Sequence, residues 1–446
     1  MLAAAALATD PKANSGATAP AGAIAIVVGA GPVGLTAALL LACRGLSCVL
    51  IEAQASDAAR ADRRLLALSR GTLDILRPLL ADELPVAPIN DVWVNSAGEF
   101  GAAHLSALDF DGAALGATVY YDDLVHALTA AVNAQPQIAW RRPARIAAIE
   151  QTPGNVVAHL VQGETLRACC VVHAEGRADS GTQREQGPAA VIADIQLAGP
   201  PADAAFERFT RAGPLALLPA PAGTPTWGLV WCVEDESAAQ RWAALGDAEF
   251  VQRLQAQLGS RRARVTHAGR RRVVFLPAQT RARLHAFRQV WLGNAAQTLH
   301  PVAGQGFNLG VRDVAVLAEC LAAARSGPAT IPPGAVTTGA VGSAADAAGT
   351  ATTAATTAAT TAAAAISGAI SDKRFCANIP AALARYARRR AGDRAAIGAV
   401  TRWLPAVFAT RFAPIAAARG AALGALDLLP PLRRQWTHLL MFGVRS

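Results

Sequence analysis

The segment from Ile24 to Glu52 constrains the fold of this chain more than any other stretch of similar length. A short apolar run, Ile24–Val28, predicts a buried strand, and a glycine-rich turn follows it. The run Leu35–Cys43 predicts a helix, and Ser47–Ile51 predicts a second strand. A strand, a turn, a helix and a strand within about thirty residues have the size of one βαβ unit. We therefore expect an α/β fold whose core is a Rossmann-like sheet.

The turn itself, GAGPVG at residues 29–34, has the spacing of a dinucleotide-binding loop. Gly29 permits a tight turn, Gly31 lets the backbone approach a pyrophosphate, and Gly34 lets the helix and strand pack closely. Glu52 ends the second strand, where a carboxylate can bind ribose hydroxyls. Residues 21–43 carry no charge and have the length of a membrane span, but a span has no need of clustered glycines.

Length and composition set broad limits. The chain has 446 residues, of which 52% are apolar and only 5% aromatic, so we expect two or three structural units with cores of Ala, Leu and Val. Its seven cysteines show no CxxC or Cys/His spacing. This pattern predicts no metal site and favours a reducing, cytoplasmic setting.

The positive charge is concentrated at the C-terminal end. From Arg374 onward there are twelve arginines and two aspartates, a net charge of +10, whereas the whole chain carries +9. Such a tail either docks on anionic lipid or an acidic partner, or forms a solvated helical face. Residues 1–22 match neither a transit peptide nor a signal peptide, and we expect them to be a disordered N-terminus.

Apolar patterning beyond the first unit predicts a second, antiparallel sheet. The runs Leu215–Leu218 and Trp227–Val233 flank a Pro/Gly turn and suit the wall of a substrate domain. Asp62–Leu76 reads as a helix and Leu166–His173 as one strand, and Val273–Leu276 returns the chain to the first domain.

These patterns divide the chain as follows. We expect a dinucleotide-binding domain at 23–200 and 273–326, an inserted substrate domain at 201–272 with part of 85–120, a low-complexity Ala/Thr insert without fixed structure at 327–371, and a basic helical region at 372–446 that Pro405, Pro414, Pro430 and Pro431 interrupt.

The segment LGNAAQTLHPVAGQGFNLGVRD, residues 292–313, reads as a strand end, a polar loop and a helix that opens at Gly304-Gln305-Gly306. Backbone N–H groups at a helix N-terminus attract negative charge. Together with the first glycine motif, this segment resembles the FAD-dependent aromatic hydroxylases of the p-hydroxybenzoate hydroxylase type. More narrowly it resembles the ubiquinone-biosynthesis branch, the 2-polyprenyl-6-methoxyphenol hydroxylases. AFERFTRAGPLALLP at 205–219 and DRRLLALS at 62–69 share that resemblance.

The resemblance implies a role for particular residues. Around the nucleotide half of FAD it implies Gly29, Ala30, Gly31, Gly34 and Glu52, and it places Arg64 near the cofactor. Around the flavin half it implies Asn294 on the ribityl chain, then Pro301, Gly304, Gln305, Gly306 and Asn308 near the ring. Glu175 stands where the family has the Asp of D-G-x-x-S, and Ser180 comes one place late. His300 is a weak candidate for a catalytic acid or base.

The reaction implied is a flavin monooxygenation. NAD(P)H reduces FAD as a transient visitor, O₂ adds to give a C4a-hydroperoxyflavin, and a polyprenylated phenol is hydroxylated. The expected location is cytoplasmic or peripheral on the inner face of a bacterial plasma membrane. The tail would contact the membrane or other quinone-pathway enzymes, and no nucleic acid partner is expected.

Two alternatives keep the same fold. An FAD-dependent oxidoreductase acting on another aromatic or lipid substrate is one, although the WxWxIP signature of halogenases is missing at Trp227–Trp231. The other is a non-catalytic lipid-binding protein, which should lack intact cofactor motifs. The hydroxylated ring carbon, the electron donor and the oligomeric state stay open.

Overall fold

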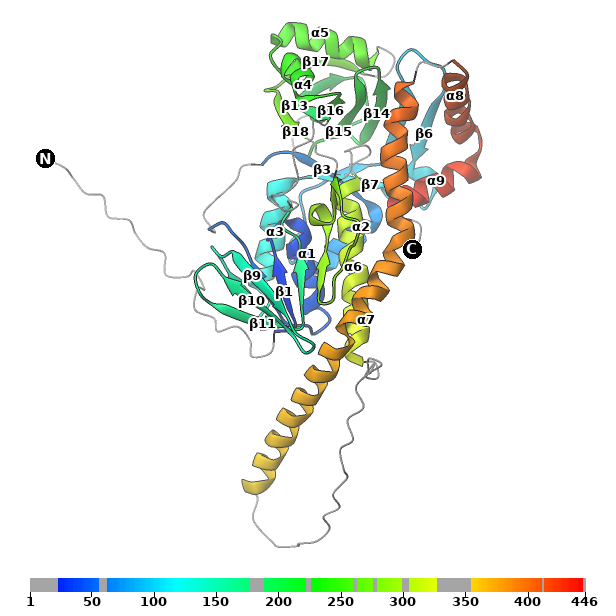
Figure 1. Cartoon of the computed structure of the whole chain (residues 1–446). Helices are drawn as coiled ribbons and strands as arrows, with labels where there is room; N and C mark the ends of the chain where they lie inside the picture. The colour runs from blue at the N-terminus through cyan, green and yellow to red at the C-terminus, as the bar shows by residue number, and fades with distance from the viewer. Residues whose placement is uncertain are drawn as a thin grey trace, which may run out of the picture.

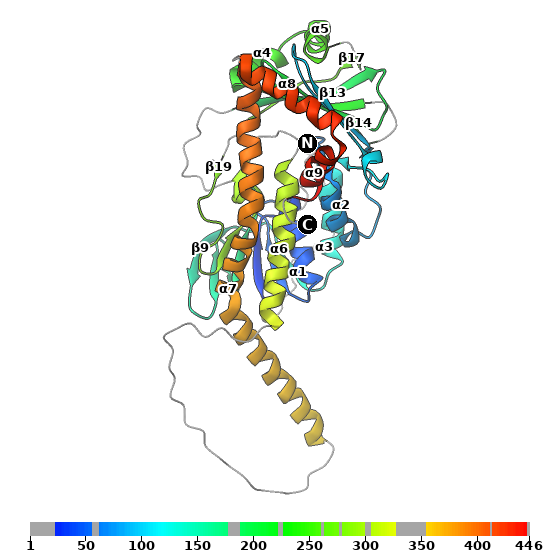
Figure 2. The same cartoon turned by 90° about the vertical axis from the view of Figure 1, so that its right-hand side faces the viewer.

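The computed structural model describes residues 23–55, 62–176, 188–221, 226–259, 263–275, 279–298, 305–326, 354–410 and 413–443. Two sheet-based layers are stacked along the long axis of the molecule, and the long helix α7 runs beside both of them (Figures 1 and 2). The expected N-terminal tail, residues 1–22, lies outside the described residues.

A five-stranded parallel sheet forms the lower layer, in the order β20-β12-β1-β2-β8. Its strands are β1 (Ala25–Val28), β2 (Cys48–Ile51), β8 (Ile138–Arg141), β12 (Cys170–His173) and β20 (Gln289–Trp291). Successive residues of β1 alternate between two cores, so both faces of the sheet are covered. This confirms the predicted α/β fold.

Helices cover one face of the parallel sheet and a small sheet covers the other. The helices are α1 (Pro32–Ala42), α3 (Tyr121–Asn133) and α6 (Gln305–Ser326). The small antiparallel sheet contains β9 (Ile146–Gln151), β10 (Val156–Leu160) and β11 (Thr165–Ala168). Gly31 caps α1 and Pro32 begins it, where the fixed φ of proline suits a first helical turn.

An eight-stranded mixed sheet forms the upper layer, in the order β17-β13-β16-β15-β14-β5-β6, with β18 also paired to β13. Its strands are β5 (Asp91–Ser96), β6 (Ala102–Ser106), β13 (Ala189–Ala198), β14 (Ala204–Thr210), β15 (Gly213–Pro219), β16 (Thr226–Val233), β17 (Arg264–Ala268) and β18 (Arg272–Phe275). Helices α4 (Glu236–Ala243) and α5 (Asp247–Leu258) pack on it around Trp227, Trp231 and Phe250. The antiparallel pairing of β15 with β16 confirms the predicted hairpin wall.

Short elements connect the two layers. They are β3 (Leu65–Ser69), β4 (Ala87–Ile89) and β7 (Gly116–Tyr120) in one sheet, the pair β19 (Gln279–Thr280) and β21 (Gln297–Thr298), helix α2 (Arg70–Leu76), and the 3₁₀ turns η1 (Arg77–Leu79), η2 (Ala107–Asp109) and η3 (Gly293–Ala295). The sheet β3-β7-β4 is antiparallel throughout.

The C-terminal region consists of helices α7 (Ala354–Ala409), α8 (Ala413–Leu428) and α9 (Pro430–Phe442). Helix α7 packs along α6 and buries Phe375, Ile379, Leu383 and Tyr386 in the main core. Among the described residues no single helix is long and apolar enough to cross a membrane. Only a pair of segments bent by 98°, Pro414–Leu428 with Pro430–Phe442, meets that test, by length and composition.

A buried cluster of charges joins α6 to α7. Arg390 lies between two carboxylates, with Nε 2.6 Å from Asp313 Oδ1 and Nη2 2.6 Å from Asp393 Oδ2. Arg394 Nη1 is 3.5 Å from Asp313 Oδ2, and Arg312 Nε is 3.6 Å from Asp393 Oδ2. All five side chains are less than 10% exposed. Two arginines of the basic tail, Arg390 and Arg394, are therefore paired inside the molecule.

Three sequence predictions about local structure were wrong. Residues 65–69, expected in a helix, form β3, because they pair with β7. The single strand expected at 166–173 is two strands, since β11 and β12 belong to different sheets. Strands β13 and β18 lie in the upper sheet rather than in the parallel sheet, so the boundaries expected near 200 and 273 do not coincide with the sheets.

Three further expectations failed in the tail and its contacts. Residues 354–371 of the Ala/Thr insert form the first part of α7, and Pro405 lies within that helix without ending it. The rest of the insert, 327–353, lies outside the described residues. Cys169 and Cys376, 207 residues apart, form a disulfide, a pairing that cysteine spacing did not indicate.

Candidate functional site

The turn after β1 is shaped so that only glycine fits at two of its positions. Gly29 has φ +95°, and a Cβ there would lie 2.6 Å from the carbonyl oxygen of Ala174. A Cβ on Gly34 would lie 1.8 Å from the carbonyl oxygen of Gly29. These contacts bring the start of α1 against the ends of β1 and β12, as the glycine motif predicts.

Gly31 differs, because open space lies beside it. A Cβ on Gly31 would meet nothing nearer than the hydroxyl of Tyr121 at 3.9 Å. No side chain caps the first turn of α1, so its backbone N–H groups are available to an anion. The turn therefore offers room and donors for a pyrophosphate.

Glu52 lies beside this turn at the end of β2. Its Oε2 accepts a hydrogen bond of 2.8 Å from the N–H of Ala30, and its Oε1 accepts one of 3.0 Å from Gln54 N–H. A carboxylate has lone pairs left after two such bonds and can still accept from ribose hydroxyls. The turn, the helix N-terminus and the carboxylate together fit the ADP half of FAD.

Arg64 lies close to the same turn. Its guanidinium stacks 4.2 Å from the ring centre of Tyr121 and pairs with Asp62 at 3.1 Å. The hydroxyl of Tyr121 is the group that faces Gly31. This chain of contacts is consistent with the predicted location of Arg64 near the cofactor.

The segment 292–313, predicted to hold the flavin half of FAD, packs against the glycine turn at residues 29–34. Gly293, with φ +54°, and Gly310 both press against Val33, since a Cβ on either would lie 3.1 Å from that side chain. Asn294 in η3 is exposed, and Gly306 near the start of α6 has open space beside it. The loop that carries His300, Pro301 and Gly304 lies outside the described residues, as does the side chain of Gln305.

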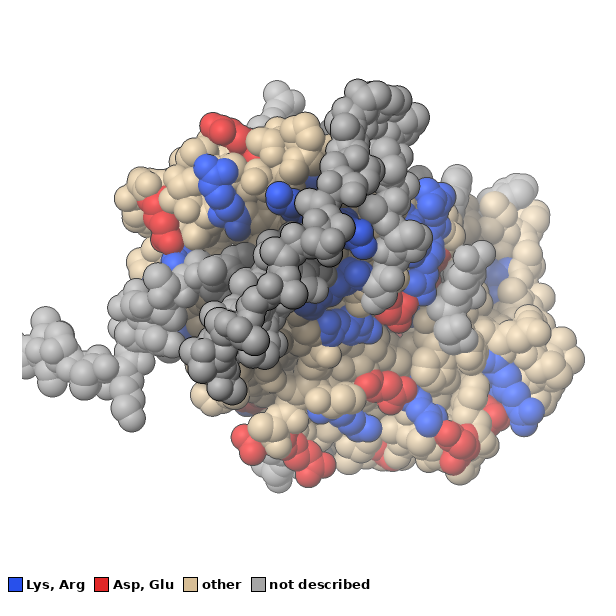
Figure 3. Space-filling view, turned by 90° about the horizontal axis from the view of Figure 1, so that it is seen from below, with Lys and Arg blue, Asp and Glu red and all other residues tan. Residues whose placement is uncertain are grey.

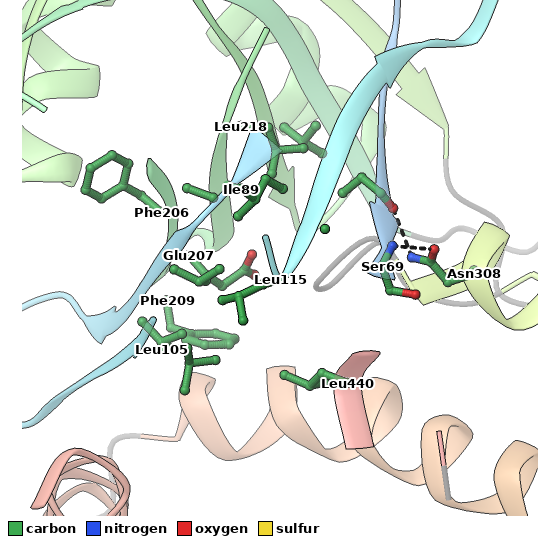
Figure 4. Close-up of a pocket in the computed structure, with 18 of the residues that line it drawn as sticks. Ser69, Ile89, Leu105, Leu115, Phe206, Glu207, Phe209, Leu218, Asn308 and Leu440 are labelled. Carbon is green, nitrogen blue, oxygen red and sulfur yellow. Dashed lines mark hydrogen bonds between the residues drawn. The ribbon is translucent and has the colours of Figure 1, made fainter. Parts of the chain in front are cut away.

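Asn308, predicted to bind the cofactor, has a structural contact in this fold. Its Oδ1 accepts a hydrogen bond of 2.9 Å from Ser69 N–H, and its Nδ2 donates one of 2.9 Å to the carbonyl oxygen of Ala67 (Figure 4). These two bonds hold α6 against β3. A cofactor role for Asn308 stays a prediction.

Glu175 lies two residues after β12 and is exposed on the surface beside the parallel sheet. Its Oε1 is 2.8 Å from His173 Nδ1, and His173 Nε2 is 2.9 Å from Gln289 Oε1. Residues 177–187 lie outside the described residues, and they include the rest of the segment that corresponds to the family's D-G-x-x-S motif. A contact between Glu175 and FAD also stays a prediction.

A cavity of about 830 Å³ opens between the upper sheet, the cofactor-motif residues and the C-terminal helices. Its volume suits a small-molecule site. Arg64, Asn294, Gly306 and Asn308 line one part of it. The rest of the lining is mostly apolar, including Leu66, Leu68, Ile89, Val92, Val94, Leu105, Leu115, Phe206, Phe209, Ala216, Leu218, Val230, Phe408, Ile415, Leu423, Trp436 and Leu440.

Two features of this cavity were missed by the sequence analysis. Helices α8 and α9 form part of its wall, which was predicted from the β15–β16 hairpin alone. Glu207 of β14 projects into the apolar space near Leu105, Leu115 and Phe209 (Figure 4). Burial raises the pKa of this carboxyl group to about 8. The alternation of Ala205, Glu207 and Phe209 was the available signal, since these positions share one strand face.

Comparisons with known proteins agree with this geometry. Residues 23–331 match the family described as FAD binding domain. The chain is 30% identical over 423 residues to the ubiquinone hydroxylase UbiL of Rhodospirillum rubrum, covering 92% of this chain and 87% of the relative. It is 29% identical over 323 residues to the 3-demethoxyubiquinol 3-hydroxylase of Escherichia coli, covering 67% and 80%.

A solved structure shows the same fold at lower identity. The p-nitrophenol 4-monooxygenase PnpA of Pseudomonas putida DLL-E4 superposes with a TM-score of 0.63 and 17% identity, over 95% of this chain and 99% of that one. The family match, the curated relatives and the fold lead to one conclusion. The chain belongs to the FAD binding domain family and is a flavin-dependent monooxygenase.

Proposed function

We propose that this enzyme hydroxylates the ring of a polyprenylated phenol in ubiquinone biosynthesis. The observation that carries the proposal is the apolar cavity, which runs from the cofactor motifs to α8 and α9. In this proposal the phenol ring lies near Gly306 and Asn308, and the apolar chain lies along the part of the cavity that α8 and α9 line. The names of the two curated hydroxylases support the same substrate class.

The contacts of the glycine turn and of Glu52 support the following roles. The glycine turn and Glu52 hold the nucleotide half of FAD, and the start of α6 stabilises negative charge on the flavin. Bound FAD supplies the activated oxygen, after reduction by NAD(P)H that visits and leaves. The apolar wall orients the ring and excludes water from it.

Gly31 gives a direct test of the cofactor site. Gly31→Val places a side chain in the open space where the pyrophosphate would lie, and its Cβ would meet nothing nearer than the Tyr121 hydroxyl at 3.9 Å. We expect the purified variant to remain folded by circular dichroism and to lose flavin absorbance. Gly154→Val, at another glycine with open space, is the matched control and should keep its flavin. A fully flavinated Gly31→Val protein would contradict this binding mode.

The substrate is tested in cells that lack the gene. Mass spectrometry of their quinone intermediates should reveal an accumulated 2-polyprenyl-6-methoxyphenol, which restoration of the wild-type gene removes. Accumulation of a different quinone intermediate would reject this ring position, and an unchanged profile would reject the pathway.

We also propose that the C-terminal helices dock on a membrane surface to admit the substrate. The large apolar side chains Ile415, Leu428, Leu429 and Leu432 on α8, on α9 and between them are 41%, 78%, 52% and 42% exposed. Basic charge is a weaker argument, because Arg419 pairs with Glu99 and Arg433 with Asp109. On the lower face of the molecule, which Figure 3 shows from below, acidic side chains likewise lie among the basic ones.

Leucine substitutions test docking without removing α7, whose side chains belong to the core. The variant Leu428→Glu with Leu429→Glu should lose sedimentation with liposomes while it keeps bound flavin. Val161→Glu, a 64% exposed valine just after β10 in the lower layer, is the control and should sediment as the wild type does. Equal sedimentation of all three proteins would reject docking through this surface.

A further inference from the structure

Glu207 is the one carboxylic acid among the described residues that line the cavity. It lies in the middle of β14, where its registered neighbours are Val94 of β5 and Ala216 of β15, both uncharged. Within the described part of the chain, no hydrogen bond or ion pair to the Glu207 side chain is found. Figure 4 shows it surrounded by apolar side chains.

The charged and titratable groups around Glu207 do not balance it. Arg419 of α8 lines the same cavity, but its guanidinium pairs with Glu99 and bonds the carbonyl oxygen of Val407. Arg64 lies toward the cofactor motifs and pairs with Asp62. Burial, and then the charge of Glu207, raise the pKa of the Cys232 thiol on β16, so this neighbour is neutral.

A carboxyl group in such a place is unfavourable for folding unless something bonds to it. Placing a polar group in an apolar cavity without a partner lowers stability, and a leucine or methionine would fill the same wall. The carboxyl group therefore makes physical sense as a contact for a ligand. Its pKa, raised to about 8, makes it a stronger base than an ordinary glutamate once ionised.

We propose that Glu207 binds the ring hydroxyl of the phenolic substrate and accepts its proton during hydroxylation, an assignment that rests on the function proposed above. The phenol O–H bond breaks as an O–H bond to the carboxylate forms. The electron pair left on the phenol oxygen moves into the ring and raises the electron density at the carbon that takes the oxygen atom. As the new C–O bond forms, the O–O bond of the oxygen donor that bound FAD would supply breaks. The ring carbon then loses its own hydrogen as a proton to the oxygen that remains on that donor, and Glu207 returns its proton to the ring oxygen.

Ligand binding separates this role from a structural one. The probe is a short-chain prenyl methoxyphenol, and its comparison ligand is the same molecule with the ring hydroxyl methylated. Binding of both is followed by calorimetry on the flavin-loaded protein. We expect Glu207→Met to bind the phenol about tenfold or more weakly, the usual effect of losing a hydrogen bond to a charged group. The methyl ether should bind the variant and the wild type equally.

The pH dependence of turnover tests the proton transfer. For the wild type, kcat/KM should rise with pH to about 8, where the carboxyl group becomes ionised. Glu207→Gln should lower kcat by about a hundredfold, typical for loss of a general base, and should lack this rise. Glu207→Asp should restore part of the rate. Glu234→Gln, an exposed glutamate just after β16, is the control and should match the wild type.

The outcomes distinguish the two proposals. Equal weakening of phenol and methyl ether by Glu207→Met, or a Glu207→Gln variant with an unchanged rate and pH profile, would overturn the role of Glu207. A wild-type protein that binds the phenol and never hydroxylates it would refute the proposed function. In that case the comparison of phenol with methyl ether still decides whether Glu207 binds the hydroxyl.

Discussion

The interface between α6 and α7 and the β14 face of the cavity each hold a carboxylate, Asp313 fully buried and Glu207 partly buried, in opposite surroundings. Asp313, 1% exposed, lies between Arg390 and Arg394, with 2.6 Å and 3.5 Å separating the charged atoms. Glu207 lies among leucines and phenylalanines and has no such partner in the described chain. Asp313 is therefore neutralised by arginines of the same chain, whereas Glu207 is free to bind a ligand in the cavity.

Whether a carboxylate has a charged partner in the fold indicates whether it serves stability, as at Asp313, or ligand binding, as we propose for Glu207. Two arginines make Asp313 part of the attachment of the C-terminal helices, which in turn complete the cavity wall. Removal of one member leaves the others charged and buried, which is strongly unfavourable. Removal of Glu207 leaves no uncompensated charge behind, so it should help the fold while it harms the reaction.

The largest expected effect comes from breaking the paired site. Asp313→Asn keeps the shape of the side chain and leaves Arg390 and Arg394 without their shared carboxylate. We expect the free energy of unfolding to fall by about 3–5 kcal/mol, measured by urea denaturation at neutral pH.

A small loss of stability in Asp313→Asn would contradict the contrast drawn between Asp313 and Glu207. A loss under about 1 kcal/mol would mean that water or another group replaces the carboxylate, so that the cluster behaves like a surface network. Flavin content of the folded fraction should stay unchanged, because Asp313 lies among α6–α7 contacts and not at the glycine turn.

The sequence could predict the geometry of the glycine turn because its signals are local. Gly29, Gly34 and Glu52 lie within one βαβ unit, and each steric requirement acts between neighbouring elements. The spacing alone therefore fixed the turn, the helix and the carboxylate. The meeting of Gly293 with Val33 was consistent with that reading, although it joins distant parts of the chain.

The missed features depend on contacts between distant segments. Leu65–Ser69 has helical composition, but it becomes a strand through β7 and through Asn308, 239 residues from Ser69. The break between β11 and β12 at Cys169 is invisible in a continuous apolar run. The isolation of Glu207 depends on α8 and α9, whose place in the cavity wall no local pattern indicates.

At Glu207, which has no charged partner among the described residues, we expect an effect of intermediate size and opposite sign, because its substitution should raise the free energy of unfolding. Burial raises the pKa of Glu207 to about 8 from an ordinary value of 4.5, so between these two pH values the folded chain holds a proton that the unfolded chain has lost. The contribution of Glu207 to the free energy of unfolding therefore falls as the pH rises from 4.5 to about 8, and it is constant at higher pH. Glu207→Gln removes the dependence, and it should be more stable than the wild type by about 2 kcal/mol at pH 9.

Urea denaturation at pH 5, 7 and 9 measures this effect, at values chosen to span the window set by the pKa near 8. The advantage of Glu207→Gln should shrink toward the acidic end, and Glu234→Gln should show no such trend. A variant that is less stable than the wild type at every pH would mean that Glu207 has a stabilising partner. In that case the contrast with Asp313 would disappear.

The smallest effect is expected at a solvent-exposed salt bridge between the same two helices, α6 and α7. Arg389 of α7 lies 2.8 Å from Glu319 of α6, and the two side chains are 46% and 47% exposed. Solvent screens this pair and both side chains lose rotamer freedom in forming it, so Glu319→Gln should cost less than about 0.5 kcal/mol. That difference should vanish in 1 M salt, where the Debye length is about 3 Å. The distance between charges is nearly the same as at Asp313, so a loss as large as that of Asp313→Asn would show that contact geometry, rather than burial, controls the energy of these pairs.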